Sequence, residues 1–588
     1  MKKLLWLLLL PAVLAGWIMS PNPGLDLWGG ANGDTLLYGS YKSSSYFHKT
    51  SGMVGEAGLL THPVGVSYAM SCFLHAFIEP TPTGYVDTLV IWMKGEENNE
   101  FDSLILRIDS AKWIKRILSA HLKIETDWTR YAIPVTFSRS GHYRIWAHIE
   151  TTTSSHEDSI YIDSLYIKRI PHDKHLKYKQ RKEKFYTAAD AYYIYDYWTH
   201  GYPESTHKLN LTGMRIQDSF SPFLDTMDVT TDLFQADWAL WDSTFELLYS
   251  AGMNRIMVLF WMSDSKWGPK GMRYDTVGNL TVGIPLREDG AMYLSRACQH
   301  TDSLLSDWGW KSSVKYVGIL GEQLTWSSYW VTSEAIDTVL SRCEEWYDTV
   351  KKYFPDVKVG MSSLLYRTFE DSAQASGYSF PQVFDTYMPH VYAYGIFEGA
   401  DSLYDVSRSL VSRVDGADRL SCSDFDFCIF AEWLTLTPNY TENNPVHWLT
   451  IPGLIGKSHT EWISWDTWVT PSWMIRFQYE DTLTALWWGQ YFLQKYQGHK
   501  TYLSDLSYSP LLFVKIEPDI YLISNPTYDT LEVILPKTGI AKVRWLDPNT
   551  EFPILRTENR SPIYEKTMCV GNRLTIPPGY MYAIEYLR

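Results

Sequence analysis

The pattern of apolar and polar positions divides the chain into three parts. In the first part, from about residue 24 to residue 170, short segments alternate apolar and polar residues, and turn residues lie between them. A period of two is typical of strands with one buried face, and a series of such strands indicates an antiparallel β-sandwich. The strands that this pattern predicts span 88–93, 104–108, 131–137, 143–149 and 160–167.

The middle part, 185–500, alternates strand-like apolar runs with amphipathic helices. This is the pattern of βα units around a parallel sheet, and its length suits a (β/α)8 TIM barrel. Helices are expected over 237–251, which Gly252 would cap, over 290–307 and over 333–353. The first barrel strand is expected near 185–188, and the others at 213–216, 254–261, 316–322, 357–361, 384–388, 427–432 and 462–465.

The last part, 505–588, returns to short strands and predicts a small C-terminal β-sandwich. Its expected strands are 511–516, 520–524, 531–535, 542–546 and 581–584. The charged run 168–184 lies between the first two parts, and we expect a linker or a solvated helix face there. The predicted fold is therefore multidomain, with a central barrel flanked by two β-sandwiches.

The N-terminus has the features of a signal peptide, which we place at residues 1–15. Lys2 and Lys3 precede the apolar run 4–14, and Val13 and Ala15 supply the small residues of a cleavage site. A run this short does not span a hydrocarbon core of about 30 Å. The expected location is secreted, periplasmic or at the cell surface, without stable membrane insertion. An uncleaved anchor is the alternative.

The net charge and the cysteine positions narrow the classes of partner, metal site and cofactor that we expect. The net charge of −15 argues against nucleic acid or an anionic membrane as a partner. The six cysteines form no CxxC pair and no Cys/His cluster with zinc-like spacing, so we expect no structural metal and no cofactor. Cys422 and Cys428 are close enough in sequence for a disulfide, but free buried thiols fit equally well.

Aromatic residues are unusually frequent, with 26 Trp and 41 Tyr among 588 residues. Sugar rings have apolar C–H faces, which indole and phenol rings cover while the sugar hydroxyls stay free to form hydrogen bonds. The composition therefore favours a carbohydrate partner where such rings fall at strand ends.

Two of the expected barrel strands end in a carboxylate, one in Glu322 and the other in Glu432. A lone buried charge is costly, so a functional role or a partner is needed to explain it. Active sites of β/α barrels lie at the C-terminal ends of the strands. Three βα units separate the two residues, which predicts that they flank a substrate bond across the barrel mouth.

The middle part resembles clan A, the largest clan of β/α-barrel glycoside hydrolases, which includes cellulases, β-mannanases and β-galactosidases. The resemblance rests on Glu322 in Gly-Ile-Leu-Gly-Glu, Glu432 in Ile-Phe-Ala-Glu-Trp, His390-Val-Tyr392, Arg215 and Trp465. It implies that Glu322, after strand four, is the acid/base and that Glu432, after strand seven, is the nucleophile. It further implies that Arg215 and Tyr392 support Glu432, and that Trp465 is an aromatic platform for the sugar.

The resemblance implies retaining double displacement on a β-linked poly- or oligosaccharide. Trp261 and Trp326 are candidate walls of sugar subsites. One departure is Gly321, since the clan usually has Asn before the acid/base. A non-catalytic polysaccharide-binding protein is therefore the alternative. A serine hydrolase or a zinc protease is disfavoured, because the chain has no Gly-x-Ser-x-Gly elbow and no HExxH motif.

The first part resembles a jelly-roll carbohydrate-binding module over 128–131, 141–145 and 161–165. The resemblance implies glycan binding by this part of the chain. A purely structural sandwich that packs against the barrel fits the same pattern.

Overall fold

The structure is a computed structural model of the 588-residue chain. It describes residues 17–18, 28–29, 35–36, 39–41, 47–51, 56–62, 64, 70–78, 80–81, 83–110, 116–138, 141–149, 155, 157–169, 175–191, 213–217, 226–228, 233–235, 238–260, 262, 272–280, 283–320, 331–364, 372–373, 376–378, 383–392, 426–432, 446–457, 460–465, 478–479, 482–506, 509–527, 530–550, 554–555 and 560–587.

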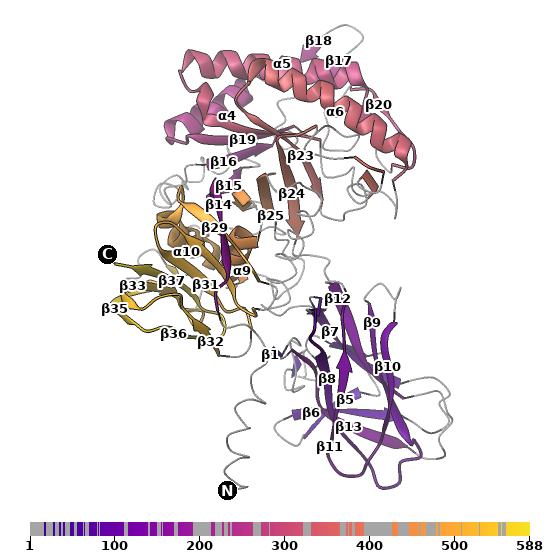
Figure 1. The fold of residues 1–588 in the computed structure, drawn as a ribbon. Helices are drawn as coiled ribbons and strands as arrows, with labels where there is room; N and C mark the ends of the chain where they lie inside the picture. The colour runs from indigo at the N-terminus through magenta and orange to yellow at the C-terminus, as the bar shows by residue number, and fades with distance from the viewer. Residues whose placement is uncertain are drawn as a thin grey trace.

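Eight strands of the middle part close into a barrel (Figure 1), and every neighbouring pair among them is parallel. In chain order they are β15 (Tyr186–Ala191), β16 (Gly213–Gln217), β19 (Arg255–Phe260), β22 (Val314–Ile319), β23 (Lys358–Leu364), β24 (Thr386–Tyr392), β25 (Asp426–Glu432) and β26 (Thr460–Trp465). Because all eight run the same way, their C-terminal ends lie at one end of the barrel.

Helices follow several of these strands. They are α4 (Trp238–Ser250), α5 (Arg287–Asp307), α6 (Ser333–Tyr353), α9 (Val446–Lys457) and α10 (Ala485–Leu493). Ile256 and Val258 of β19 belong to the core that these helices share. The buried Met257 and Leu259 alternate with them and lie outside that shared core. A Cβ on Gly318 would lie 2.5 Å from the Leu259 side chain, so glycine is needed for this close strand packing.

The C-terminal part forms a seven-stranded sheet in the order β14-β29-β30-β31-β37-β33-β35. A second layer pairs β32 (Leu531–Ile534) with β36 (Arg573–Ile576). The strands of the large sheet are β14 (Tyr178–Lys184), β29 (Lys500–Ser504), β30 (Leu512–Ile516), β31 (Ile520–Ser524), β33 (Gly539–Leu546), β35 (Ile563–Val570) and β37 (Met581–Tyr586). Buried residues of this sheet and of the barrel form one continuous core.

The expectation of a linker or a helix face over 168–184 is wrong for its second half, which is strand β14. This strand pairs antiparallel with β29, far away in the sequence. The Tyr178 ring packs 5.5 Å from the Tyr502 ring, and the Lys515 ammonium lies 4.9 Å from the Tyr178 ring. Aromatic packing and cation–π contacts thus favour a strand where the charge pattern indicates solvent.

The N-terminal part consists mainly of two antiparallel sheets around a separate core. One has the order β11-β8-β13-β6-β5 and the other β10-β9-β12-β7-β4. The strands are β4 (Gly39–Tyr41), β5 (Phe47–Ser51), β6 (Glu56–His62), β7 (Met70–Ile78), β8 (Asp87–Gly95), β9 (Ser103–Ser110), β10 (Arg116–Lys123), β11 (Thr129–Val135), β12 (Gly141–Ile149) and β13 (Asp158–Arg169).

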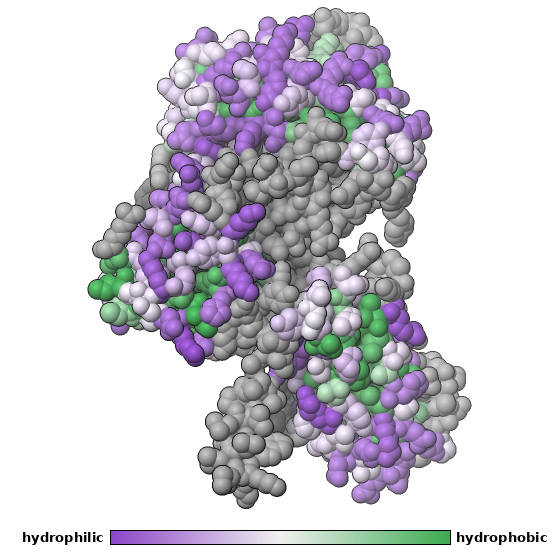
Figure 2. Space-filling model, in the orientation of Figure 1, coloured by the Kyte–Doolittle hydropathy of each residue, from purple (hydrophilic) through white to green (hydrophobic). Residues whose placement is uncertain are grey.

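The visible surface differs in hydropathy between the barrel helices and the C-terminal sheet. Hydrophilic side chains cover most of the visible face over α4, α5 and α6 in Figure 2. Apolar side chains gather at the outer edge of the C-terminal sheet, where Ile540 and Met568 are exposed. None of the helices that the structure describes is both long enough and apolar enough to cross a bilayer.

Candidate active site

Several predicted site residues lie near the C-terminal ends of neighbouring barrel strands. Glu432 is the last residue of β25, and Tyr392 is the last residue of β24. The two are partners in the strand register. Trp465 ends β26 and is the register partner of Ala431, the residue before Glu432. The backbones of Tyr392, Glu432 and Trp465 therefore stand side by side on the sixth, seventh and eighth strands.

Two further predicted residues lie on the same barrel. His390 is on β24, two residues before Tyr392, and is the register partner of Phe430. Arg215 is on β16, the second strand, opposite Asp190 of β15 on one side and Met257 of β19 on the other. The closed barrel puts one strand, β15, between the strands of Trp465 and Arg215.

Strand four ends earlier than its apolar run predicts. The expected strand reached Glu322, whereas β22 ends at Ile319. Leu320 follows with φ 74°, and its side chain is fully buried. The left-handed region is costly for a residue with a branched side chain, and it ends the extended conformation. Strained backbone of this kind concentrates at functional sites, and here it stands two residues before Glu322.

Side chains from the loops that follow strands three and five bind the backbone just before α6. The Val331 amide donates to Ser372 Oγ at 3.0 Å, and the Thr332 amide donates to Asn279 Oδ1 at 3.0 Å. Thr332 caps α6, since its hydroxyl accepts from the Ala335 amide. Side chains from two neighbouring loops thus hold the backbone at the start of α6.

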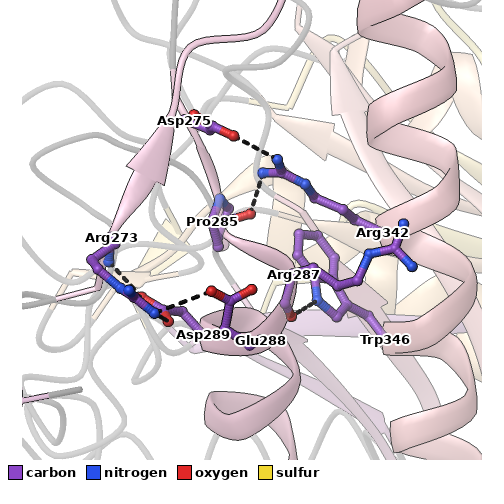
Figure 3. Close-up of polar contacts among 8 residues, drawn as sticks. All are labelled: Arg273, Asp275, Pro285, Arg287, Glu288, Asp289, Arg342 and Trp346. Carbon is purple, nitrogen blue, oxygen red and sulfur yellow. Dashed lines mark hydrogen bonds and ion pairs between the residues drawn. The ribbon is translucent and has the colours of Figure 1, made fainter. Parts of the chain in front are cut away.

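The loop after strand three is joined to α5 and α6 by a polar network around the buried Asp289 and Arg342 side chains (Figure 3). Its hairpin pairs β20 (Tyr274–Asp275) with β21 (Ile284–Pro285). Arg273 binds the buried Asp289 carboxylate through Nη2 at 2.5 Å and Nε at 3.0 Å. Arg342 of α6 donates to the Pro285 carbonyl at 2.5 Å and to Asp275 at 2.8 Å.

Charge-assisted bonds of this kind are stronger than neutral ones. The hydrogen bond to Asp289 raises the pKa of the Arg273 side chain. The network therefore ties the hairpin of β20 and β21 to α5 and α6. The pairing of Arg273 with Asp289 across the hairpin leaves no signal in the sequence that could have revealed it.

Other predicted residues lie outside the described residues, namely Glu322, Trp261 and Trp326. Cys422 also lies outside them, so the Cys422–Cys428 disulfide stays a prediction. Cys298 and Cys343 are free thiols, and burial raises the pKa of both. In the part of the chain that the structure describes, no group of three His, Cys, Asp or Glu side chains could hold a metal ion.

No protein-family model and no curated protein matches the chain. An arabinose-bound GH51 α-L-arabinofuranosidase aligns with 97% of this chain and 94% of its own at 11% identity and a TM-score of 0.42. A monomeric β-xylosidase from Caulobacter crescentus aligns with 71% of this chain and 100% of its own, at 13% identity and a TM-score of 0.41.

An arabinose complex of an α-L-arabinofuranosidase from Thermotoga maritima aligns with 70% of this chain and 98% of its own. Its identity is 13% and its TM-score 0.42. All three are described as glycosidases.

Proposed function

We propose that the chain is a secreted glycoside hydrolase that cleaves β-linked poly- or oligosaccharides with retention of configuration. The observation that carries this proposal is the position of Glu432. It is the last residue of the seventh strand of a closed parallel barrel, between the strands that end in Tyr392 and Trp465. In our proposal the closed barrel is a (β/α)8 catalytic domain, and a jelly-roll-like sandwich and a small C-terminal sandwich flank it.

The first step forms a covalent bond between the enzyme and the sugar. A Glu432 carboxylate oxygen attacks the anomeric carbon, the glycosidic C–O bond breaks, and the proton of Glu322 passes to the leaving oxygen. In the second step Glu322 takes a proton from water, and the water oxygen replaces Glu432 at the anomeric carbon. Two inversions give net retention.

The neighbouring residues have supporting roles in this proposal. A cationic Arg215 keeps Glu432 ionised, since a nearby positive charge lowers a carboxyl pKa. Tyr392 donates a hydrogen bond to Glu432, and His390 binds substrate beside it. Trp465, Trp261 and Trp326 cover sugar faces.

A panel of aryl β-glycosides, with the first-formed anomer identified by NMR, tests the proposal. We expect hydrolysis of at least one member and release of the β-anomer first. Release of the α-anomer would contradict retention. No turnover together with binding of a polysaccharide would favour the alternative, a non-catalytic binding protein, for which the specific support is Gly321 in place of Asn.

A further inference from the structure

The outer face of one N-terminal sheet carries half-exposed aromatic rings where solvent would favour polar residues. On β8, Leu89, Ile91 and Met93 lie in the sandwich core, so Trp92 and Lys94 alternate toward the other face, and both are partly exposed. On a sheet with one solvated face, alternation normally leaves polar residues outside. Half-exposed rings there point to a surface that binds something.

The strand register extends this face over three strands. Trp92 lies opposite Arg130 of β11 and Ser164 of β13. Lys94 lies opposite Tyr161, and Val90 lies opposite Tyr166. Trp128 precedes β11 at the same end as Lys94. Val90 is fully buried beneath this face, so it is not part of the exposed surface. We call the partly or fully exposed residues the β8 face: Trp92, Lys94, Trp128, Arg130, Tyr161, Ser164 and Tyr166.

The β8 face carries two cations, Lys94 and Arg130, and the Glu96 side chain hydrogen-bonds to Tyr161 beside them. The Lys94 ammonium lies 4.7 Å from the centre of the Tyr161 ring and 5.4 Å from that of the Trp128 ring. Arg130 is exposed. Among the described residues, neither Lys94 nor Arg130 forms an ion pair with a carboxylate. The carboxylate of Asp163, at the bulge in β13, is only 4% exposed.

We propose that the β8 face binds an acidic glycan, a polysaccharide that contains uronic acids. Rings such as Trp92 and Tyr166 would cover the apolar sugar faces, while Lys94 and Arg130 would pair with the sugar carboxylates. Aromatic rings beside cations also suit single-stranded nucleic acid. A net charge of −15 opposes any densely charged polyanion over the long range. Lys94 and Arg130 are too few to follow a backbone with a phosphate at every nucleotide, whereas a glycan with widely spaced carboxylates needs only a few cations. The proposal rests on the proposed function only in naming a carbohydrate.

Affinity electrophoresis of the full chain tests the inference without requiring turnover. The gels contain glucuronoxylan, neutral xylan or no polymer, and the Glu432→Gln background prevents digestion of the polymer. We expect glucuronoxylan, which carries spaced uronic acids on a xylan backbone, to retard the protein more than neutral xylan does, and added salt to reduce that difference. The double variant Trp92→Ala/Lys94→Gln should weaken the association at least tenfold.

The control is Lys123→Gln, which removes an exposed lysine from the other sheet of the same part and should leave retardation unchanged. Arg130→Gln changes an exposed side chain and should weaken binding severalfold without affecting the fold. Unchanged retardation in both β8-face variants would overturn the proposal, as would equal retardation by neutral xylan or release of glucuronoxylan by a single-stranded oligonucleotide.

The two proposals fail separately. With an intact Glu432, the β8-face variants should hydrolyse a small aryl glycoside at the parental rate. Loss of polymer binding with full turnover would leave the hydrolase assignment untouched, and absence of all turnover would leave the binding result standing.

Discussion

Leu320 is the residue at which the described backbone departs most clearly from what its sequence predicts. Nothing in the run Val-Gly-Ile-Leu indicates a left-handed conformation, because leucine is ordinary in strands. The φ of 74° is therefore a feature of the folded backbone that the local sequence does not indicate. The positions of Arg215 and Glu432 on the barrel, in contrast, follow from counting apolar runs.

The strain at Leu320 predicts an unusual order of stabilities. Leu320→Gly and Leu320→Ala both remove a buried side chain, but only glycine adopts positive φ without a steric penalty. We expect the Gly variant to be more stable than the Ala variant by about 1 kcal/mol. Chemical denaturation measures the difference. In an extended strand Gly is the less stable of the two, so that order would show that Leu320 is unstrained.

A substitution of Glu322 tests its proposed role as the acid. The variant Glu322→Gln cannot donate a proton, so cleavage of glycosides with poor leaving groups should slow by about 10²–10⁴-fold. Nitrophenolate leaves without protonation, so nitrophenyl glycosides should lose much less in their glycosylation step. Steady-state and burst kinetics on both substrate types compare the two. Equal losses would indicate that Glu322 is not the acid.

Among the elements, barrel strands with a continuous apolar run are the ones that the sequence predicts well. The observed β19, β25 and β26 begin and end within two residues of the expected strands, and in β19 the run is buried from Ile256 to Phe260. Strand β35 was not predicted, since six consecutive residues of it are exposed and leave no alternation to detect. The partner of β14 was also unpredictable, because β29 lies more than 300 residues away.

Gly278, in the loop after strand three, lies close to the start of α6. Gly278 has φ 55°, and a Cβ there would lie 2.2 Å from Thr332 Oγ1 at the start of α6. Gly278→Ala should therefore lower the free energy of unfolding by about 2–4 kcal/mol, from backbone strain and overpacking together.

Gly309→Ala is the matched control. Gly309 also has positive φ, 64°, but nothing lies within 4 Å of its Cβ position. It should cost only about 1 kcal/mol, from backbone strain alone. Equal costs for the two variants in thermal or chemical denaturation would show that the loop does not pack against α6.

The buried apolar residues that the structure describes form two separate cores, one in the N-terminal part and one shared by the barrel and the C-terminal sheet. We therefore expect two calorimetric transitions. Asp87→Asn should lower the transition of the N-terminal part, because it removes the carboxylate that pairs with the buried Arg169 guanidinium. The cost in the free energy of unfolding should be about 3–5 kcal/mol.

Gly456→Ala should lower only the transition of the core that the barrel and the C-terminal sheet share. A Cβ on Gly456 of α9 would lie 2.5 Å from the Phe513 carbonyl oxygen of β30, where the barrel part meets the C-terminal sheet. A single transition that both variants shift equally would contradict the division into two cores.

The central claim is that Glu432 is the nucleophile of a glycoside hydrolase, and its most direct test is the kcat of Glu432→Gln. The measurement uses the aryl β-glycoside that the parent hydrolyses best, with ligand binding followed separately. We predict that kcat falls by about a thousandfold or more while ligand binding is retained, because glutamine does not form the glycosyl ester. A kcat within tenfold of the parent's would contradict it.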